Sequence, residues 1–374
     1  MTRHTLLCTV GTSLFGNLGR LSEGDPDNPS NWQALRQAFD RGEWNKLARE
    51  LATLPPAARV CGAEINTVEE VRKKSWLTLE HLVFLVSDTP HGENTGRLLK
   101  GYFQQRRELG LRAVDCCVVK DLQDERPKDF KAYGLRNLVR NAGEYIQRAG
   151  GSQHVAIDAT GGYKAQIAIA LLVGQALNIP VSYKHERFSE IIDFPPLPVT
   201  FDDQILARNA DLLTDLERNA VLSSADVGPL DEKLRVLLSE VAVNGETLYE
   251  LSPIGQIYLT GFRIRNPKPV NLVAASTRKP PTFRDDHYPI GFKEFVHKVC
   301  NQNIWIRAAN SIPYDKQRSI KGTGFVVRQE GEELRLIGTY QDRNNFGARF
   351  RLHLTDQSPA ALAWAAEYLN RTYR

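Results

Sequence analysis

The sequence predicts an α/β protein whose first half is built on a parallel β-sheet. Three observations support this fold class. Apolar runs alternate with longer helical patterns over the first two hundred residues, the runs are apolar on both faces, and 374 residues suffice for two or three domains. Strands that are apolar on both faces need helices above and below the sheet. We therefore expect a Rossmann-like, doubly wound domain over residues 1–200.

The expected strands and helices of this domain alternate along the chain. The predicted strands are 5–10 (TLLCTV), 81–87 (HLVFLVS), 112–120 (RAVDCCVVK), 154–159 (HVAIDA) and 180–186 (PVSYKHE). Apolar residues at helical spacing predict helices over 31–54, 95–110, 129–150 and 162–177. A proline cluster follows the last strand and marks the end of the domain.

Two smaller modules are expected after this domain. Residues 201–265 hold two helical patterns, 204–219 and 230–243, and then two short strands that turn at Ser-Pro-Ile-Gly, which predicts a winged-helix-like linker. Residues 266–374 begin with a helical pattern over 291–312 and continue with three alternating segments typical of an antiparallel meander. A helix with Ser358 as its N-cap closes the chain. The tail is therefore expected to be a small α+β domain.

The charge of the chain is divided unevenly. Residues 261–374 contain nineteen Lys and Arg against ten Asp and Glu, a net charge of +9, whereas the remainder contains 29 against 34, a net charge of −5. A basic tail on a mildly acidic body indicates that the tail meets a polyanion. The alternative is a basic surface that is merely solvated.

Composition argues against membrane and disulfide-rich classes. No apolar run is long and uninterrupted enough to span a bilayer, and the N-terminus shows no secretory signal, so we expect a cytoplasmic protein. The five cysteines include no CxxC pair that could bind a metal or carry out redox chemistry.

Three predicted strand ends carry glycines and polar side chains. They are Gly11, Thr12 and Ser13 after the first strand, Ser87, Asp88, Thr89 and Asn94 after the second, and Thr160, Gly161, Gly162 and Lys164 after the fourth. The carboxyl ends of parallel strands meet at one edge of the sheet, where ligands bind. Glycine lets the backbone approach a phosphate, a helix start offers free N–H groups, and hydroxyl and amide groups suit sugar or base edges. We therefore expect a phosphate-and-ribose site there.

The usual nucleotide fingerprints are absent from this site. GTSLFGNLG only half resembles the G-x-G-x-x-G loop of dinucleotide-binding proteins, and no GxxxxGK[ST] loop occurs. No cofactor and no metal are expected.

The VGTS loop after the first strand and the DATGGYK loop after the fourth together resemble the CARF family, the CRISPR-associated Rossmann-fold sensors of cyclic oligoadenylates. The resemblance covers residues 1–200. It implies a homodimer in which both loops of each copy close around one cyclic RNA ring, with cyclic tetra-adenylate favoured as the allosteric activator. A two-fold ligand suits a two-fold dimer.

The resemblance also implies a second activity of the sensor. Some CARF domains cleave their ring without a metal, by attack of a ribose 2′-hydroxyl on the adjacent phosphate. Ser13 and Lys164 are the candidates for assisting this ring-nuclease step. The alternative is that both residues only bind.

The tail lacks the motifs of two common nuclease classes. A HEPN ribonuclease needs an arginine and a histidine with roughly four to six residues between them on a helix. None of His287, His297 or His353 has an arginine at that spacing, and Arg148 and His154 are separated by the helix-breaking GGSQ. The tail also lacks the Glu-x-Lys triplet of a metal-dependent restriction-type nuclease, which argues against a two-metal mechanism.

Cations on the predicted tail strands point to RNA instead. Arginines with a tyrosine can grip phosphates, stack a base and stabilise the charge of a 2′-hydroxyl attack. In element order, size and charge the tail resembles the RelE family of ribosome-dependent mRNA endonucleases. The candidate catalytic residues are Lys321, Arg328, Arg335, Tyr340, Arg349 and Arg351.

Other roles for these residues stay open. Arg371 and Tyr373 could provide part of the site, Arg328 and Arg335 could form only exposed ion pairs with the glutamates of the hairpin, and Tyr340 could be a core aromatic.

The two resemblances together predict a cyclic-oligoadenylate-activated endoribonuclease of type III CRISPR defence that cuts mRNA on the ribosome. Two other function classes remain as alternatives. One is a transcription regulator that binds DNA through the winged helix, although that module is acidic. The other is a small-molecule enzyme, which leaves the basic tail unexplained.

Overall fold

The computed structural model describes residues 3–74, 76–185, 190–199, 201–219, 221–285, 287–313, 320 and 322–374. The chain divides into two compact units. Unit 1 comprises Met1–Thr200 and Gln256–Ile264, and unit 2 comprises Phe201–Gly255 and Arg265–Arg374. The predicted division at 200, 265 and 374 stays a prediction.

Unit 1 is built on a largely parallel sheet. Its strands lie in the order β3 (Ala113–Val119), β2 (Leu77–Ser87), β1 (Arg3–Thr9), β4 (Val155–Asp158), β5 (Val181–Tyr183) and β6 (Ile192–Phe194). All neighbours are parallel except β5 and β6. The predicted Rossmann-like α/β fold class is therefore confirmed. Glu186, the end of the fifth predicted run, lies outside the described residues.

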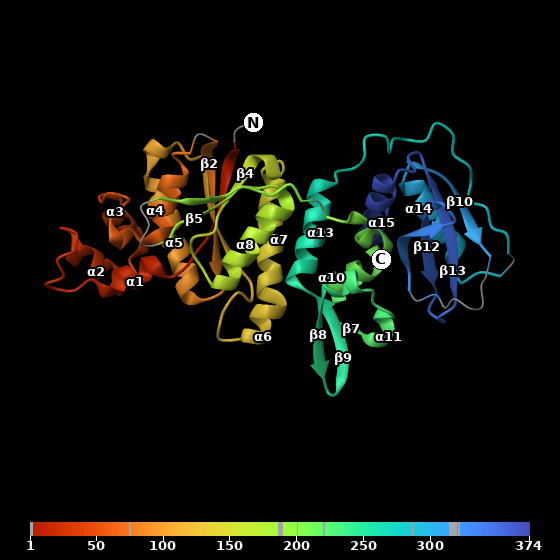
Figure 1. Cartoon of the computed structure of the whole chain (residues 1–374), viewed down its shortest axis with the longest axis horizontal. Coiled ribbons are helices and arrows are strands. Elements are labelled where there is room, and N and C mark those ends of the chain that lie inside the picture. Colours follow the sequence, from red (N-terminus) through yellow and green to blue (C-terminus); the bar gives the residue numbers. More distant parts are fainter. Residues whose placement is uncertain are drawn as a thin grey trace. The chain divides into compact units, whose positions relative to one another are not determined.

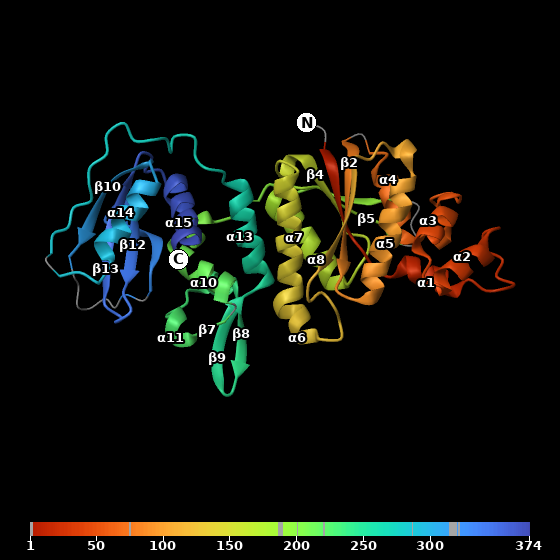
Figure 2. The same cartoon turned by 180° about the vertical axis from the view of Figure 1, so that it is seen from behind.

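Helices cover both faces of this sheet (Figures 1 and 2), with α4 and α5 on one side and α7 and α8 on the other. The alternation of each strand divides its side chains between the two layers: Leu6 and Phe84 pack toward the α5 side, whereas Leu7 and Leu85 line the layer beneath α7 and α8. The helices of the unit are α1 (Ser13–Arg20), α2 (Trp32–Asp40), α3 (Trp44–Ala52), α4 (Gly62–Val71), α5 (Pro90–Gln105), α6 (Pro127–Asp129), α7 (Leu135–Arg148) and α8 (Lys164–Leu177). Short helical turns are η1 (Arg59–Cys61), η2 (Arg107–Leu109), η3 (Phe130–Gly134) and η4 (Ser152–His154).

The single helix predicted over 31–54 is wrong. Two helices, α2 and α3, form instead, and the chain breaks between them at Gly42, whose φ is +65°. Glycine adopts this left-handed conformation without steric cost, so it is a natural break point in an otherwise helical pattern.

The first part of unit 2 differs from the two helices and a hairpin that we expected. Residues 204–219 form α9 (Asp203–Arg208) and α10 (Ala210–Asn219), but 230–243 gives only the short α12 (Glu232–Arg235) before strand β8 (Leu238–Val243). β8 pairs with β9 (Glu246–Leu251) through a turn at Asn244 and Gly245, which both have positive φ. Asn-Gly is a strong signal for a two-residue hairpin, and it outweighed the helical spacing.

The predicted turn at Ser-Pro-Ile-Gly is also wrong. Pro253 of this motif instead begins helix α13 (Pro253–Arg265), whose middle belongs to unit 1. There Thr260 lies against Gly143 of α7 so closely that a Cβ on Gly143 would approach its methyl group to 2.5 Å. β7 (Leu222–Ser223) and α11 (Ser224–Val227) complete this part of the chain, and β7 pairs with β9.

The tail folds as an antiparallel sheet with helices α14 (Phe292–Gln302) and α15 (Pro359–Tyr373). Its strands lie in the order β10 (Ile306–Ile312), β13 (Gly347–Leu354), β12 (Glu333–Gln341) and β11 (Gly324–Glu330). The helix predicted over 291–312 is therefore wrong in its second half, because pairing of β10 with β13 stabilises a strand there. Ser358 caps α15 as expected, since its Oγ accepts a hydrogen bond from the Ala361 N–H at 3.3 Å.

Both helices of the tail cover the same face of its sheet. Phe325 and Phe350, fully buried on that face, contact the rings of Phe292 and Phe295 from α14, and Asn370 of α15 hydrogen bonds the backbone of Phe325. The alternation of β13 leaves Arg349, Arg351 and His353 on the other face.

Candidate functional site

The three predicted loops meet at one edge of the sheet of unit 1. β1 lies between β2 and β4, with Thr9 beside Leu85 and Cys8 beside Asp158, so the three strands end together. The Thr9 hydroxyl donates a hydrogen bond to the Gly161 carbonyl at 2.6 Å and joins the first loop to the third. The loops that follow these strands therefore lie together at the carboxyl edge of the sheet.

The two glycine loops touch through their backbones. A Cβ on Gly11 would lie 2.7 Å from the Gly162 nitrogen, and a Cβ on Gly161 would lie 2.6 Å from the Gly11 nitrogen. Such approaches are closer than real Cβ contacts, so only glycine fits at either position. The loops therefore form one surface, which we call the glycine cradle (Gly11–Ser13 and Thr160–Lys164).

Gln166 anchors the second loop of the cradle. Its side chain is fully buried, and its Oε1 accepts a hydrogen bond from the Tyr163 N–H at 3.2 Å. Gly162 has a φ of +104°, and a Cβ there would collide with Gln166 Oε1. This arrangement brings Lys164 to the exposed first turn of α8, where the free N–H groups of a 14-residue helix and a cation stand together.

Ser13 is held by a buried carboxylate that the sequence analysis missed. Its hydroxyl donates a hydrogen bond to Glu64 Oε2 at 2.6 Å and accepts one from the Ala63 N–H at 3.0 Å. Glu64 is only 4% exposed, and its Oε1 lies beneath Gly11 with no hydrogen-bond partner in the described part of the chain. The Ser13 hydroxyl is therefore oriented by the protein rather than free to rotate.

A second carboxylate, that of Asp158, lies under the other half of the cradle. Asp158 is 1% exposed, and its Oδ1 accepts hydrogen bonds from the Thr160 N–H at 3.0 Å and the Thr160 hydroxyl at 2.6 Å. Burial raises the pKa of Asp158 to about 7, against the opposing effect of these hydrogen bonds and with a further increase from the Glu64 charge. The Thr160 hydroxyl thus serves first to hold Asp158.

The groups after β2 serve mainly to shape their loop. Thr89 caps α5 by accepting from the Gly92 N–H at 3.0 Å, and its hydroxyl lies 3.0 Å from that of Ser87. Asp88 Oδ2 accepts from the Asp121 N–H at 2.9 Å. Asn94, in the first turns of α5, has no side-chain hydrogen bond within the described residues, so its amide is available to a ligand.

The predicted ligand set therefore divides in two. The side chains of Thr12, Asn94 and Lys164 make no hydrogen bond or ion pair among the residues that the structure describes. These side chains and the backbone of the cradle are the groups that can contact a ligand. The other hydroxyl and carboxylate groups hold the loops in place. Glu64 escaped the sequence analysis because it lies in a helix far from the two loops in sequence. Gln166 follows the DATGGYK loop closely but resembles an ordinary buried helical residue.

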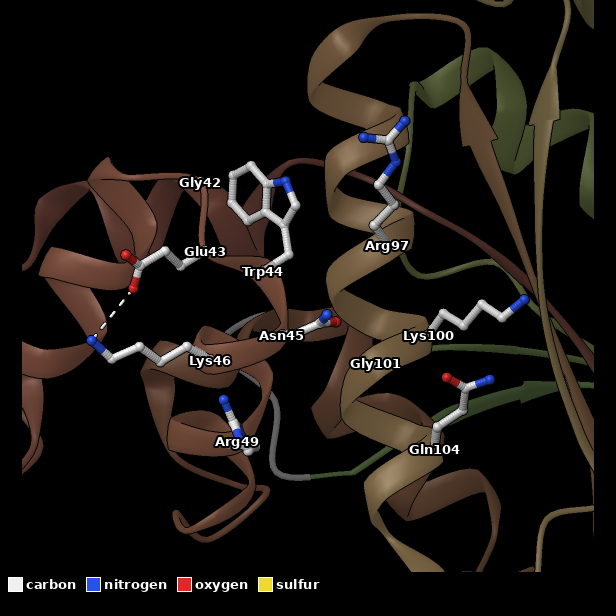
Figure 3. A pocket seen from close by; sticks show the side chains of 10 residues that line it. All are labelled: Gly42, Glu43, Trp44, Asn45, Lys46, Arg49, Arg97, Lys100, Gly101 and Gln104. Atoms are coloured by element: carbon white, nitrogen blue, oxygen red, sulfur yellow. Dashed lines mark ion pairs between the residues drawn. The ribbon is translucent and has the colours of Figure 1, made fainter.

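A cationic pocket of about 690 Å³ lies between α3 and α5 (Figure 3). Lys46 and Arg49 come from α3, and Arg97 and Lys100 from α5. Lys46 pairs with Glu43 at 3.4 Å. The sequence analysis did not find this pocket, because its cations come from two helices that are separated in the chain.

In the tail, the register of the strands places the four predicted arginines on the sheet face opposite the helices. Register places Arg351 beside Ile337 and Arg349 beside Thr339, and Arg335 lies two residues before Ile337 on the same face. Arg335 pairs with Glu333, and Arg351 pairs with Glu330. The alternative role considered for Arg335, an ion pair with a glutamate of the hairpin, is thus present, and Arg351 forms such a pair as well.

Arg328 of β11 lies opposite Arg335 in the strand register, and its side chain donates a hydrogen bond to the Arg208 carbonyl at 3.2 Å. Tyr340 is placed apart from the arginine face. It lies on the helix-covered face, where its hydroxyl donates to the Ile290 carbonyl at 2.9 Å and its ring packs against Phe295. Lys321 lies outside the described residues.

Tyr373, the alternative site residue, is also on the helix-covered side. Its hydroxyl lies 2.8 Å from Asn303 Nδ2 and 2.9 Å from Gln302 Oε1, and its ring contacts Phe325. It therefore joins α15 to the end of α14 and lies away from the arginine face.

His353 is the residue that the structure adds to the arginine face. The sequence analysis set it aside because it lacks the arginine spacing of a HEPN site. Its Nε2 lies 3.0 Å from Asn310 Nδ2. Burial lowers the pKa of His353, and the charges of Arg351, Arg335 and Arg307 lower it further.

The described residues contain no group of three His, Cys, Asp or Glu side chains placed to hold a metal ion. They also contain no helix that is both long and apolar enough to cross a bilayer.

Comparison with known proteins gives one family match. Residues 59–197 match a family described as CRISPR-associated protein (Cas_APE2256). This range is less than half of the chain; it includes β2 to β6 and the Gly161–Gly162 loop, and it begins after the VGTS loop. This part of the chain is therefore similar to CRISPR-associated proteins, in agreement with the sensor resemblance.

The other matches are partial. Two inosose dehydratases of Clostridium botulinum, from strains Eklund 17B and Alaska E43, are 32% and 31% identical over 102 residues, which is 24% of this chain and 34% of each relative. The chain thus spans about a third of the length of these relatives. The structure of Can2 from Sulfobacillus thermosulfidooxidans in complex with cyclic tetra-adenylate is 8% identical, with a TM-score of 0.24 over 71% of this chain and 63% of that one. A likeness at this score carries no argument.

Proposed function

We propose that this chain is an endoribonuclease of type III CRISPR defence that a cyclic oligoadenylate activates. The observation that carries the proposal is the glycine cradle, in which two glycine loops meet at the sheet edge beside Lys164 and the start of α8. Phosphates suit the free N–H groups and the cation, and the Asn94 amide suits a base or ribose edge. The match of residues 59–197 to a CRISPR-associated family supports the same ligand class.

Two copies of unit 1 would close around one ring. Cyclic tetra-adenylate is the favoured ring, because its two-fold symmetry suits a homodimer. The ring must bind the active arrangement better than the resting one, since only differential affinity shifts the equilibrium. Ser13, oriented by Glu64, and Lys164 are the candidates for cleaving the ring and ending the signal.

The arginine face of the tail is the proposed site of RNA cleavage, and the proposed substrate is mRNA on the ribosome. Arg335, Arg349 and Arg351 would bind the phosphates and stabilise the charge that develops when the ribose 2′-hydroxyl attacks. This chemistry needs no metal. The order of the helices and strands in the tail and its positive charge resemble those of the RelE family and support this assignment.

The test is incubation of the protein with translating ribosomes and mRNA, with and without cyclic tetra- or hexa-adenylate. We expect mRNA cleavage only with the ring. Lys164→Ala should lose ring binding by calorimetry and lose activation, whereas Arg148→Ala, which removes an exposed cation paired with Glu144, should keep both.

Absence of cleavage under every condition would contradict the proposal. If ring-dependent binding to duplex DNA appeared instead, the transcription-regulator alternative would gain support. An unchanged response of Lys164→Ala would remove Lys164 from the ligand site.

A further inference from the structure

His353 lies at the centre of the arginine face. Along β13 it is two residues from Arg351, and across the sheet Asn310 of β10 stands beside Arg351. Arg335, on the same face of β12, and Arg307, at the start of β10, are close enough for their charges to lower the pKa of His353. The imidazole is therefore the titratable group among several fixed cations.

A hydrogen bond from Asn310 fixes the tautomer of the His353 imidazole. The Asn310 Oδ1 accepts a hydrogen bond from the Thr282 hydroxyl at 2.8 Å, which leaves Nδ2 to donate to His353 Nε2 at 3.0 Å. An amide nitrogen only donates, so Nε2 accepts and its lone pair points to a position where a donor binds. The ring is thereby held as the tautomer whose basic nitrogen is Nε2.

Arg351 offers a phosphate donor next to this base. Its terminal nitrogen pairs with Glu330, but its Nε is shielded from solvent and has no hydrogen-bond acceptor in the part of the chain that the structure describes. A buried donor without an acceptor is costly unless a ligand completes it. A phosphate oxygen of RNA would satisfy it.

We propose that His353 is the general base of RNA cleavage, held in its basic tautomer by Asn310 and placed beside the Arg351 phosphate donor. This inference rests on the proposed ribonuclease function. The RNA 2′-hydroxyl replaces Asn310 as the donor to Nε2, and its proton passes to Nε2 as the O2′–P bond forms. The P–O5′ bond breaks, and the leaving oxygen takes a proton from water. The products are a 2′,3′-cyclic phosphate and a 5′-hydroxyl.

The charges around His353 fit this role. Arg351, Arg335 and Arg307 disfavour the imidazolium, as does burial, so the ring is neutral and ready to accept a proton near neutral pH. Glu330 and Glu333 already pair with Arg351 and Arg335, and the histidine has no carboxylate partner of its own among the described residues. The same arginines would stabilise the negative charge of the transition state.

The experiment compares His353→Gln with His297→Gln in the full-length protein under ring activation. His297 is an exposed histidine on α14, on the other side of the sheet, and serves as the matched control. We expect His353→Gln to slow cleavage about 100-fold or more, as loss of a general base does, with unchanged ring affinity and melting temperature. His297→Gln should keep the wild-type rate.

The pH profile separates a base from a structural residue. The wild-type rate should fall on the acid side as His353 becomes protonated, and this limb should disappear in His353→Gln. Asn310→Ala should move the limb to higher pH, because the Asn310 hydrogen bond favours the neutral ring. The products should carry 2′,3′-cyclic phosphate ends.

Three results would overturn the inference. A wild-type rate in His353→Gln would exclude the base, and a slower variant that keeps the acid limb would show a structural role only. In both cases ring-dependent cleavage by the wild type would leave the proposed function standing. A wild-type protein that never cleaves RNA would overturn the function and the inference together.

Discussion

The buried carboxyl group of Asp158, beneath the Thr160–Lys164 loop, makes the stability of the folded chain depend on pH. Its pKa in the folded chain is raised to about 7 by burial, whereas an unfolded aspartate titrates near 3.9. Between these pH values the folded state keeps a proton that the unfolded state has released. The free energy of unfolding therefore falls as pH rises from about 4 to about 7 and levels off above that.

The variant Asp158→Asn tests this pH dependence. The asparagine oxygen can still accept the hydrogen bonds from Thr160, so the loop is preserved. We expect urea unfolding of the wild type to show a loss on the order of 4 kcal/mol over this pH range that Asp158→Asn lacks. Asp40→Asn, an exposed control on α2, should behave like the wild type. Parallel curves for all three proteins would contradict the raised pKa.

Gly162 tests the cradle itself. Gly162→Ala introduces a Cβ at a φ of +104° and against Gln166. Gly245→Ala also has a positive φ, +82°, but meets nothing within 4 Å. We expect the first variant to lose about 2 kcal/mol more stability than the second in urea unfolding, because it adds a collision to the backbone strain. Ring binding should weaken only in Gly162→Ala, and equal losses would show that Gln166 moves aside.

Tyr340 distinguishes the two faces of the tail sheet. Because its hydroxyl bonds the Ile290 carbonyl on the helix-covered face, Tyr340→Phe should cost about 1 kcal/mol of stability. Ring-activated cleavage should keep its rate, since the arginines lie on the other face. A strong loss of cleavage at unchanged stability would return Tyr340 to the catalytic set expected from the sequence.

At the scale of elements, β12 and β13 bring the arginines together. Arg335 and Arg351 are sixteen residues apart in the chain, and antiparallel pairing places them on one face. The double variant Arg335→Ala, Arg351→Ala should lower cleavage about 100-fold or more by removing charge stabilisation, while calorimetry shows unchanged ring binding. Lys298→Ala, a cation of α14, is the control. Cleavage by the double variant at the wild-type rate would place the site elsewhere.

Two of the wrongly predicted helices share one physical cause. The runs 230–243 and 291–312 have helical spacing, yet each ends as a strand because a neighbouring strand pairs with it: β9 pairs with β8, and β13 pairs with β10. The spacing of apolar residues is a property of one chain segment, whereas a ladder of backbone hydrogen bonds depends on both of the strands that form it. The five parallel strands of unit 1 were predictable because their length and continuous apolar character allow few other structures, whereas the antiparallel edge strand β6 was not predicted.

At the scale of the whole molecule, the proposal requires two copies of the chain. We expect a dimer in analytical ultracentrifugation and one ring per two chains in calorimetry, because the proposed pocket takes its two glycine cradles from two copies. Cyclic tetra-adenylate should also raise the melting temperature of the wild type but leave that of Lys164→Ala unchanged. A monomer that binds one ring per chain would contradict the shared pocket.

The sequence by itself determined the doubly wound α/β class, the strand ends that carry the ligand loops, the glycines that the loops require and the basic character of the tail. These follow from periodicity, composition and backbone sterics, which act within a few neighbouring residues. Only the tertiary structure decided that Glu64 holds Ser13, that Gln166 supports Gly162, that His353 stands among the arginines and that Tyr340 does not. Contacts between residues far apart in the chain depend on strand register and helix packing, and no local pattern specifies either.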